Sequence, residues 1–283
     1  MVGGSIILMK INDQKKQLKK IVNLKKNNNY DNVKLQDLKK LPTFNGLVEL
    51  SFKNKLFYMV NIENDDAVPL KYLWRNKYEN LSLNLWYDMT RKNGFFFDVG
   101  AHTGIYSIIG NLDKNENNII SIEAFYINYT RLLSNFKLNK ITPDKCFLSA
   151  ASNSEGIDKF KAKTIFNHST GGKLSEQGTL SVPKIKIDNF KLEKKICGIK
   201  IDTEGYELEV LKGGIVLIAR DKPDIIFEIN KNCFDKCLGI LKSYGYKFYF
   251  IDEINDKLTN VNQFNSKLKK SEGSNCYATV KQI

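Results

Sequence analysis

The chain has 283 residues, of which 42% are hydrophobic and 11% aromatic, enough to build one enlarged globular core. Its five cysteines are odd in number and include no Cys-x-x-Cys pair, which argues against a disulfide framework and a common zinc site. No run approaches the roughly 18 to 20 apolar residues that span a bilayer, and residues 3–9 lack the features of a signal peptide. We therefore expect a cytoplasmic protein without a transmembrane segment or a bound metal.

Much of the positive charge lies near the N-terminus. The formal net charge is +13, and residues 10–40 carry ten lysines against three aspartates. Apolar residues recur among these lysines near helical spacing, namely Ile11, Leu18, Ile21 and Val22. This pattern predicts a basic amphipathic helix within a lysine-rich extension over residues 1–45. The extension is either a solvated arm or a surface for RNA, a membrane or a protein partner.

The first elements after the extension are a hairpin and a helix. Residues 47–52 and 56–62 are rich in β-forming residues and are separated by Lys53-Asn54-Lys55, which predicts the hairpin. Leu81, Leu85 and Met89 then recur at helical spacing, and this predicted helix stops at Asn93-Gly94.

From about residue 94, strand-like apolar runs alternate with helical patterns, as in a parallel sheet with crossover helices. Seven strands are predicted, at residues 95–99, 119–123, 146–150, 196–202, 224–228, 246–251 and 276–280. Between the third and the fourth lies an irregular insertion, residues 152–190, in which His168 is predicted to lie in a loop. Residues 46–283 are thus predicted to form a doubly wound, Rossmann-like α/β domain with its ligand-binding core beginning near residue 94.

The end of the first core strand carries a glycine-rich turn. Asp98-Val99-Gly100-Ala101-His102-Thr103-Gly104 leads from an apolar strand into a helix, and its two glycines allow the backbone to turn tightly beside a ligand. The second strand ends in Glu123, 25 residues after Asp98, where a carboxylate accepts hydrogen bonds from both hydroxyls of a ribose. Ala150, at the third strand end, is small enough for an adenine ring to lie nearby. An ordinary strand-to-helix turn is the alternative interpretation of this motif.

Asp98 distinguishes between cofactors. A dinucleotide fingerprint has its first glycine at this position, and a carboxylate there would repel a pyrophosphate. The same charge suits the ammonium and sulfonium groups of S-adenosylmethionine. We therefore expect S-adenosylmethionine rather than a nicotinamide cofactor, with His102 either contacting it or serving as a polar residue at an exposed helix start.

The fourth predicted strand ends in three ionisable residues. Lys200 and Asp202 point to one face of the strand, and Glu204 is predicted to begin the next helix. Such a cluster suits proton transfer, although capping by Asp202 and a dipole interaction of Glu204 are the structural alternative. Glu228, which ends the fifth strand, is either a site residue or a packing terminus.

These blocks resemble the FkbM family of methyltransferases, from about residue 78 to the C-terminus. The glycine-rich turn is similar to the family's cofactor loop, Ile122-Glu123-Ala124 to its second-strand acid, and residues 199–213 to its most specific signature. His102 and Ala124 stand where the family commonly has asparagine and proline. The resemblance implies transfer of a methyl group to a hydroxyl, often on a sugar or a polyketide.

Together these observations predict an S-adenosylmethionine-dependent O-methyltransferase for a hydroxyl of a sugar, glycan or polyketide-like acceptor. Asp202 or Glu204 is expected to take or orient the hydroxyl proton, and Lys200 to stabilise developing charge on oxygen. Two alternatives remain, an RNA ribose 2′-O-methyltransferase that uses the basic extension and a catalytically inactive module that binds the cofactor. The predicted cofactor-binding residues are Asp98, Gly100, Ala101, His102, Thr103, Gly104, Glu123, Ala124 and Ala150.

Overall fold

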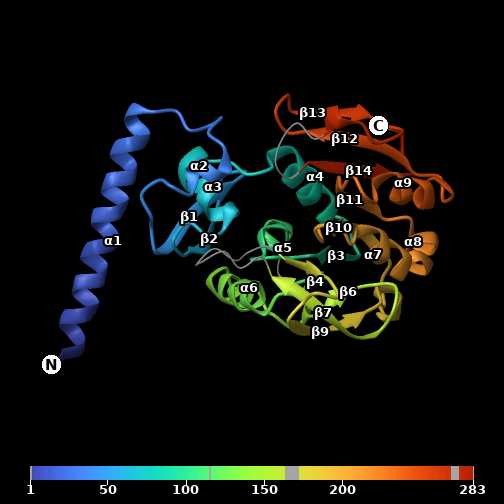
Figure 1. Ribbon diagram of the computed structural model, residues 1–283, viewed down its shortest axis with the longest axis horizontal. Helices are drawn as coiled ribbons and strands as arrows, with labels where there is room; N and C mark the ends of the chain where they lie inside the picture. The colour runs from blue at the N-terminus through green and yellow to red at the C-terminus, as the bar shows by residue number, and fades with distance from the viewer. Residues whose placement is uncertain (1, 115, 163–171, 269–273, 283) are drawn as a thin grey trace. The chain divides into compact units, whose positions relative to one another are not determined.

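The computed structural model describes residues 2–114, 116–162, 172–268 and 274–282, with side chains from residue 13 onward (Figure 1). His168 therefore lies outside the described residues. The described chain divides into two compact units, and the division falls between Tyr78 and Glu79. Among the described helices, none has both the length and the apolar character that crossing a membrane requires.

The first unit contains two helices, a hairpin and a third helix, in that order. α1 (Val2–Asn27) and α2 (Leu35–Leu38) precede β1 (Gly46–Phe52) and β2 (Lys55–Asn61), which pair antiparallel, and α3 (Ala67–Arg75) follows. The hairpin thus occupies the two β-rich runs on either side of Lys53-Asn54-Lys55. Asp66 begins α3 by accepting a hydrogen bond from the amide of Val68 at 2.9 Å. Every second hairpin residue is buried, which places one face of the hairpin in the core of this unit.

α1 lies in the predicted basic segment, but its apolar residues do not share one environment. Ile21 is buried, whereas Leu18 and Val22 are 38% and 49% exposed. Ile11 belongs to the part of the helix whose side chains are not described. The predicted apolar face is therefore reduced to Ile21 in the described part of α1.

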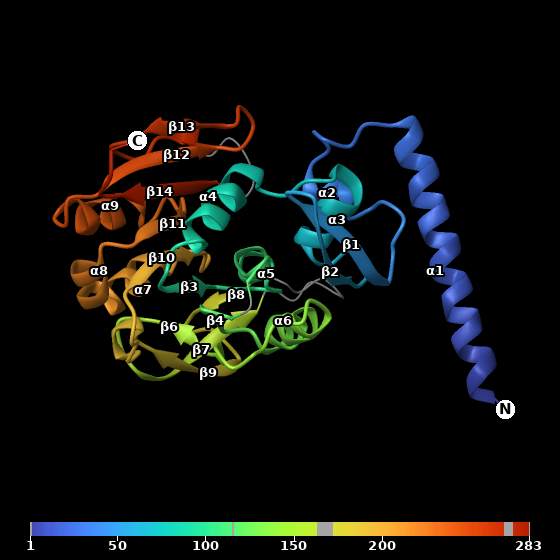
Figure 2. The same cartoon turned by 180° about the vertical axis from the view of Figure 1, so that it is seen from behind.

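The second unit is built on a large mixed sheet. Among the described residues eight strands form it, in the order β13-β12-β14-β11-β10-β3-β4-β5 (Figures 1 and 2). β5, β4, β3, β10 and β11 are parallel, and β14 is antiparallel to both of its neighbours. The strands are β3 (Phe95–Val99), β4 (Ile119–Glu123), β5 (Cys146–Leu148), β10 (Ile196–Ile201), β11 (Asp224–Glu228), β12 (Lys247–Asp252), β13 (Lys257–Asn260) and β14 (Asn275–Thr279).

Each of the seven predicted strands has a counterpart in this sheet, but the predicted count is one too low. The additional strand, β13, pairs with β12 at the edge of the sheet. Leu258 is its one apolar residue, and the strand buries none of its side chains. It therefore lacks the hydrophobic alternation by which a strand is recognised in a sequence.

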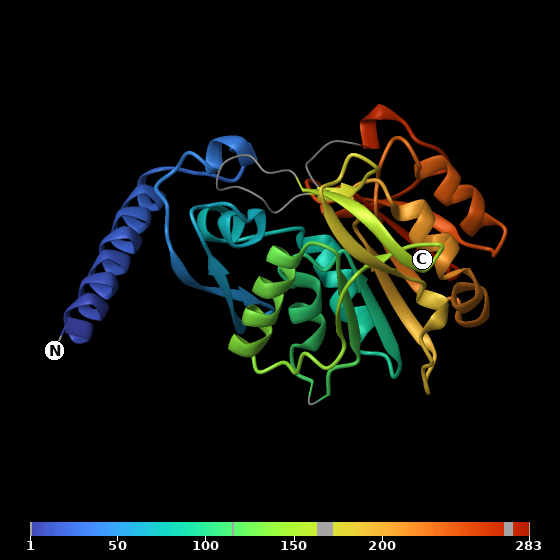
Figure 3. The same ribbon diagram turned by 60° about the horizontal axis from the view of Figure 1, so that its bottom comes forward.

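Helices cover both faces of the large sheet (Figure 3). One face carries α4 (Asn80–Thr90), α5 (Ile105–Asn111) and α6 (Tyr126–Leu138), and the other carries α7 (Glu207–Gly213), α8 (Ile215–Asp221) and α9 (Phe234–Lys242). Trp86 of α4 packs edge-on against Phe96 of β3 and Tyr106 of α5, with ring centroids 6.2 and 6.0 Å apart. This two-sided cover confirms the predicted α/β class.

The prediction of an irregular insertion over residues 152–190 is wrong, because the described residues of this segment contribute to a second sheet. Its strands are β6 (Ala150–Ala151), β7 (Gly156–Ala162), β8 (Gly172–Leu174) and β9 (Leu180–Ile185), in the order β6-β9-β7-β8, and the short 3₁₀ helix η1 (Ile187–Asn189) follows. β7 is mostly exposed and alternates lysines with Phe160, which hid its strand character. Ala150 also belongs here, paired with Lys184, and does not end β5 as predicted.

Candidate active site

The site lies at the carboxyl ends of β3 and β10, the two neighbouring strands at which the strand order reverses. From this switch point, β4 and β5 continue the sheet in one direction and β11 in the other. Ligands of doubly wound sheets bind outside the strand ends at such a point. The glycine-rich turn follows β3, and the ionisable residues Lys200 and Asp202 lie at the end of β10.

The glycine-rich loop after β3 is held by the backbone of β4 and by α6. The amides of Gly100 and Ala101 both donate to the carbonyl oxygen of Ile122, at 2.8 and 3.0 Å. Asn135 of α6 donates through its side chain to the carbonyl oxygen of Thr103 at 2.8 Å, and both residues are fully buried. The loop is therefore fixed in place by its neighbours in the described structure.

Left-handed backbone conformations shape the same loop. Gly100 and Gly104 have φ of 76° and 99°, and His102 between them has φ of 52°. A Cβ atom at Gly100 would collide with the carbonyl oxygen of Asp202, which follows β10. Gly100 is thus required by the close approach of two strand ends, a reason additional to the tight turn that the motif predicts.

Glu123, at the end of β4, forms a hydrogen bond with the glycine-rich loop. Its carboxylate accepts hydrogen bonds from the amides of His102 and Phe125, each at 2.8 Å, and from the side chain of Asn128 at 3.5 Å. Burial raises the pKa of Glu123 above its ordinary value, while these donors oppose the shift. A carboxylate offers roughly four acceptor positions, so these three donors leave capacity for a ligand hydroxyl.

Asp98 lies beneath the loop and is 1% exposed. Its carboxylate accepts a hydrogen bond from the hydroxyl of Ser107 at 2.6 Å, and Ser107 also contacts the hydroxyl of Ser121 at 2.7 Å. Burial raises the pKa of Asp98 to about 6, although Ser107 and the charge of Lys200 oppose the shift. Above this pH the carboxylate places a buried negative charge under the loop.

Two small residues and an aromatic ring adjoin this region. Ala150 is 6% exposed and packs in a buried apolar cluster with Phe125, Phe160 and Val182, and Ala124 packs against the same cluster. The structure therefore brings Ala124 and Ala150 to one cluster, although Ala124 follows β4 of the large sheet and Ala150 belongs to β6 of the second sheet. A flat apolar ligand group would suit surroundings of this kind.

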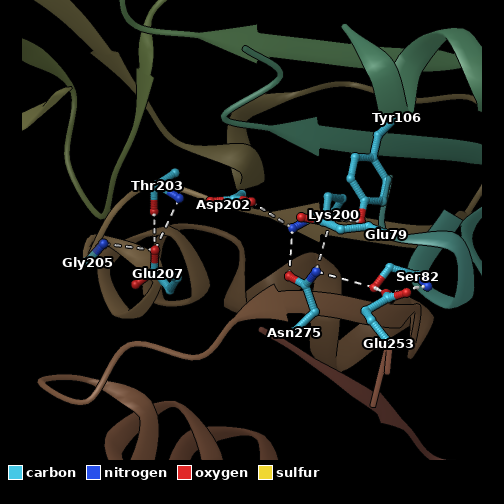
Figure 4. Close-up of polar contacts among 10 residues, drawn as sticks. All are labelled: Glu79, Ser82, Tyr106, Lys200, Asp202, Thr203, Gly205, Glu207, Glu253 and Asn275. Atoms are coloured by element: carbon cyan, nitrogen blue, oxygen red, sulfur yellow. Dashed lines mark hydrogen bonds and ion pairs between the residues drawn. The ribbon is translucent and has the colours of Figure 1, made fainter. Parts of the chain in front are cut away.

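Lys200 is the central charge of the ionisable cluster at the end of β10 (Figure 4). It is 1% exposed, and its ammonium group lies 3.1 Å from the carboxylate of Asp202 and 3.0 Å from the side-chain oxygen of Asn275. The ammonium also lies 4.9 Å from the ring centre of Tyr106. Burial lowers the pKa of Lys200, but the carboxylates of Asp202 and Glu79 outweigh this effect and leave it above its ordinary value. Lys200 is therefore a buried cation.

The residues that surround Lys200 extend into a polar network which the sequence did not reveal (Figure 4). The carboxylate of Glu79 accepts hydrogen bonds from the hydroxyl of Tyr106 at 2.7 Å and from the side-chain amide of Asn275 at 3.2 Å. Asn275 also contacts Ser82 at 3.2 Å, and Ser82 donates to Glu253 at 2.6 Å. These residues belong to α4, α5 and β14, to the position before α4 and to the turn after β12, so no motif spacing links them.

The loop after β10 is organised by Glu207 rather than by Asp202. One carboxylate oxygen of Glu207 accepts hydrogen bonds from the amide and the hydroxyl of Thr203, both at 3.1 Å, and from the amide of Gly205 at 3.0 Å (Figure 4). α7 begins at Glu207 with Tyr206 at its N-cap position, so the prediction that Glu204 begins this helix is wrong. Glu204 instead lies exposed in the preceding bend with φ of 56°, because Glu207 folds the loop back on itself. The side chain of Asp202 remains 32% exposed beside Lys200.

Glu228 ends β11 on the next strand, as predicted. One of its carboxyl oxygens is buried and has no hydrogen-bond partner in the described part of the chain. Burial, followed by the negative charges of Asp202, Glu204 and Glu207, raises the pKa of Glu228 to about 9. No group of three or more His, Cys, Asp or Glu side chains suited to a metal ion occurs among the described residues.

Comparison with known proteins places this arrangement in context. The sequence profile described as the methyltransferase FkbM domain matches residues 98–248, more than half of the chain. No curated protein matches the sequence. Similar solved structures include an FkbM methyltransferase from Methylobacillus flagellatus KT, 15% identical over 86% of this chain and 57% of its own, with a TM-score of 0.41. This chain thus spans just over half the length of that protein.

Two further solved structures are similar to this chain at low identity. The precorrin-6y C5,15-methyltransferase from Geobacter metallireducens GS-15 is 15% identical over 72% of this chain and 87% of its own, with a TM-score of 0.40. The tRNA (uracil-54, C5)-methyltransferase from Pyrococcus abyssi, in complex with S-adenosyl-L-homocysteine, is 10% identical over 83% of this chain and 44% of its own, with a TM-score of 0.44.

Proposed function

This chain belongs to the FkbM family of methyltransferases, and we propose that it transfers a methyl group from S-adenosylmethionine to a hydroxyl of a sugar, glycan or polyketide-like acceptor. One observation carries the proposal. The glycine-rich loop and the end of β10 are in backbone contact, since the amide of Asp202 donates to the carbonyl oxygen of Val99 at 2.9 Å. A cofactor on this loop would therefore lie beside the Lys200–Asp202 pair.

The residues around the loop suit S-adenosylmethionine chemically. Glu123 keeps capacity to accept from a ribose hydroxyl, and Ala124 and Ala150 leave room for a flat base beside Phe125. The negative charge of Asp98 beneath the loop favours a cationic ligand. We assign cofactor binding to these residues and to Gly100, Ala101, His102, Thr103 and Gly104. When bound, S-adenosylmethionine supplies a methyl group activated by a sulfonium.

The residues after β10 would act on the acceptor. The carboxylate of Asp202 is partly exposed and lies 3.1 Å from the ammonium of Lys200, so it accepts the hydroxyl proton and orients the oxygen. Lys200 stabilises the negative charge that develops on this oxygen. Glu204 is exposed nearby in the sequence and serves as the alternative orienting carboxylate. Positioning of the hydroxyl contributes the larger share of the rate, because methyl transfer requires the oxygen in line with the bond that breaks.

The test is methyl transfer by the purified protein. With radiolabelled S-adenosylmethionine and a panel of sugars and polyols, we expect label in at least one acceptor and release of S-adenosylhomocysteine. The same panel contains capped RNA, which addresses the second candidate function. Binding of the cofactor without transfer to any acceptor would favour the catalytically inactive module.

Methylation of an RNA ribose is the second candidate, and the exposed lysines of α1 favour it. Lys15, Lys16, Lys19 and Lys20 are all exposed on this helix. Lysines bind phosphates with an affinity that falls steeply as salt is added. If RNA is the acceptor, binding should weaken steeply between 50 and 200 mM salt, as is typical for phosphate contacts. Removal of residues 1–40 should then abolish most of this binding.

A further inference from the structure

Glu228 lies in one row with Asp202 and Asn275 at the strand ends. Ile201 of β10 is paired in register with Phe227 of β11, so Asp202 and Glu228 follow at the same level on neighbouring strands. Glu228 is in turn paired with Asn275 of β14. Side chains of paired residues point to the same face of a sheet. The three side chains therefore share the face that carries Lys200, two residues before Asp202.

The surroundings of Glu228 are unfavourable for an ionised carboxylate. Asp202, Glu204 and Glu207 contribute negative charge, and Lys200, the cation that opposes them, is already paired with Asp202 and Asn275. A buried carboxyl oxygen without a partner destabilises a fold. The pKa of about 9 means that Glu228 carries a proton at neutral pH. A buried carboxyl group in energetically unfavourable surroundings, at a strand end of the candidate site, indicates a functional role.

We propose that Glu228 is an acceptor-binding residue whose carboxyl group donates a hydrogen bond to a second oxygen of the acceptor, on the carbon next to the reacting hydroxyl. This inference rests on the proposed methyl transfer. Neighbouring strands lie about 4.8 Å apart, so Asp202 and Glu228 are spaced to bind two adjacent oxygens of one ligand. The acceptor class is therefore a compound with oxygens on neighbouring carbons, such as a vicinal diol.

Glu228 keeps its proton throughout the reaction. The bond between the acceptor oxygen and the methyl carbon forms as the bond between that carbon and sulfur breaks, and the electron pair of the broken bond stays on sulfur. The proton of the reacting hydroxyl passes to Asp202. Glu228 contributes by holding the neighbouring oxygen, so its loss should act mainly on acceptor KM.

The first measurement is thermal unfolding from pH 5 to 9.5, which requires no acceptor. A carboxyl group whose pKa is raised in the folded state stabilises the fold at low pH, and this stability is lost as pH rises from about 4.5 towards 9. Glu228→Gln should remove this part of the pH dependence and raise the melting temperature at pH 8. Glu193→Gln removes an exposed acid, and the melting temperature of this control should show the same pH dependence as that of the unchanged protein. A lower melting temperature for Glu228→Gln at pH 8 would overturn the proposal.

The second measurement is methyl transfer to pairs of sugars, each tested beside the deoxy analogue that lacks the neighbouring hydroxyl. Glu228→Leu should raise KM for the complete sugar by about tenfold and leave KM for the deoxy analogue little changed. Glu228→Gln keeps a hydrogen-bond donor and should recover most of the lost affinity. Equal losses in both variants, or equal effects on both sugars of a pair, would overturn the proposal. Absence of transfer by the unchanged protein would instead contradict the proposed function, while the unfolding data would still report the state of Glu228.

Discussion

The carbonyl oxygen of Asp202 occupies the space that a Cβ atom of Gly100 would fill. The glycine-rich loop after β3 and the end of β10 are therefore in close contact. Gly100→Ala should cost about 1 to 2 kcal/mol for its left-handed conformation, and the collision should add to this cost. Gly245→Ala is the matched control, because Gly245 has φ of 85° but no atom within 4 Å of an added Cβ. Denaturant unfolding should show a clearly larger loss for Gly100→Ala, and equal losses would contradict the close approach.

Cofactor binding should stabilise the protein. At about a hundredfold excess over Kd, S-adenosylmethionine or S-adenosylhomocysteine should contribute roughly 2.7 kcal/mol to the free energy of unfolding. Glu123→Ala should weaken this effect, because Glu123 is the proposed acceptor for ribose hydroxyls. Glu176→Ala, at an exposed acid, should retain it. Melting that responds to NAD and not to either compound would refute the cofactor assignment.

Asp202→Asn tests the proposed proton acceptor. The substitution keeps an oxygen for Lys200 but removes the charge that accepts a proton, so turnover should fall by about a hundredfold or more. The melting temperature should change little, since the carboxylate of Glu79 and the side chain of Asn275 remain near Lys200. Glu204→Gln is the parallel variant, because Glu204 is the alternative carboxylate of the proposed mechanism and is exposed. Near-normal turnover in both variants would remove these carboxylates from the mechanism.

Removal of residues 1–40 separates the extension from the core. We expect cofactor binding to survive, because the proposed binding residues all belong to the second compact unit. Ile21 is buried, however, so the truncation should expose part of the core of the first unit and lower the stability of that unit. Calorimetry in the presence and absence of S-adenosylhomocysteine distinguishes these effects. A truncated protein that no longer binds the cofactor would contradict the predicted independence of residues 46–283 from the extension.

The sequence by itself determined the α/β class, seven of the eight strands of the large sheet and the motifs at the ends of its strands. These features depend on local signals. Apolar runs such as β3 bury nearly every side chain, and the turn from Asp98 to Gly104 needs glycines at fixed places. The FkbM membership followed from the same short blocks. β13 and β7 were not predicted, because exposed strands with charged or polar faces do not show the hydrophobic pattern of a buried strand.

Only the tertiary structure decided how the charges of the site are compensated. Lys200 is held by Asn275, 75 residues later in the chain, and Asn275 in turn contacts Glu79, 196 residues earlier. A buried cation requires partners, but the partners come from whichever strand ends are adjacent in space. The sheet order that brings β10 and β14 to either side of β11 is set by long-range packing. For this reason spacing along the sequence identified Lys200 and Asp202, whereas the network around them became visible only in the folded chain.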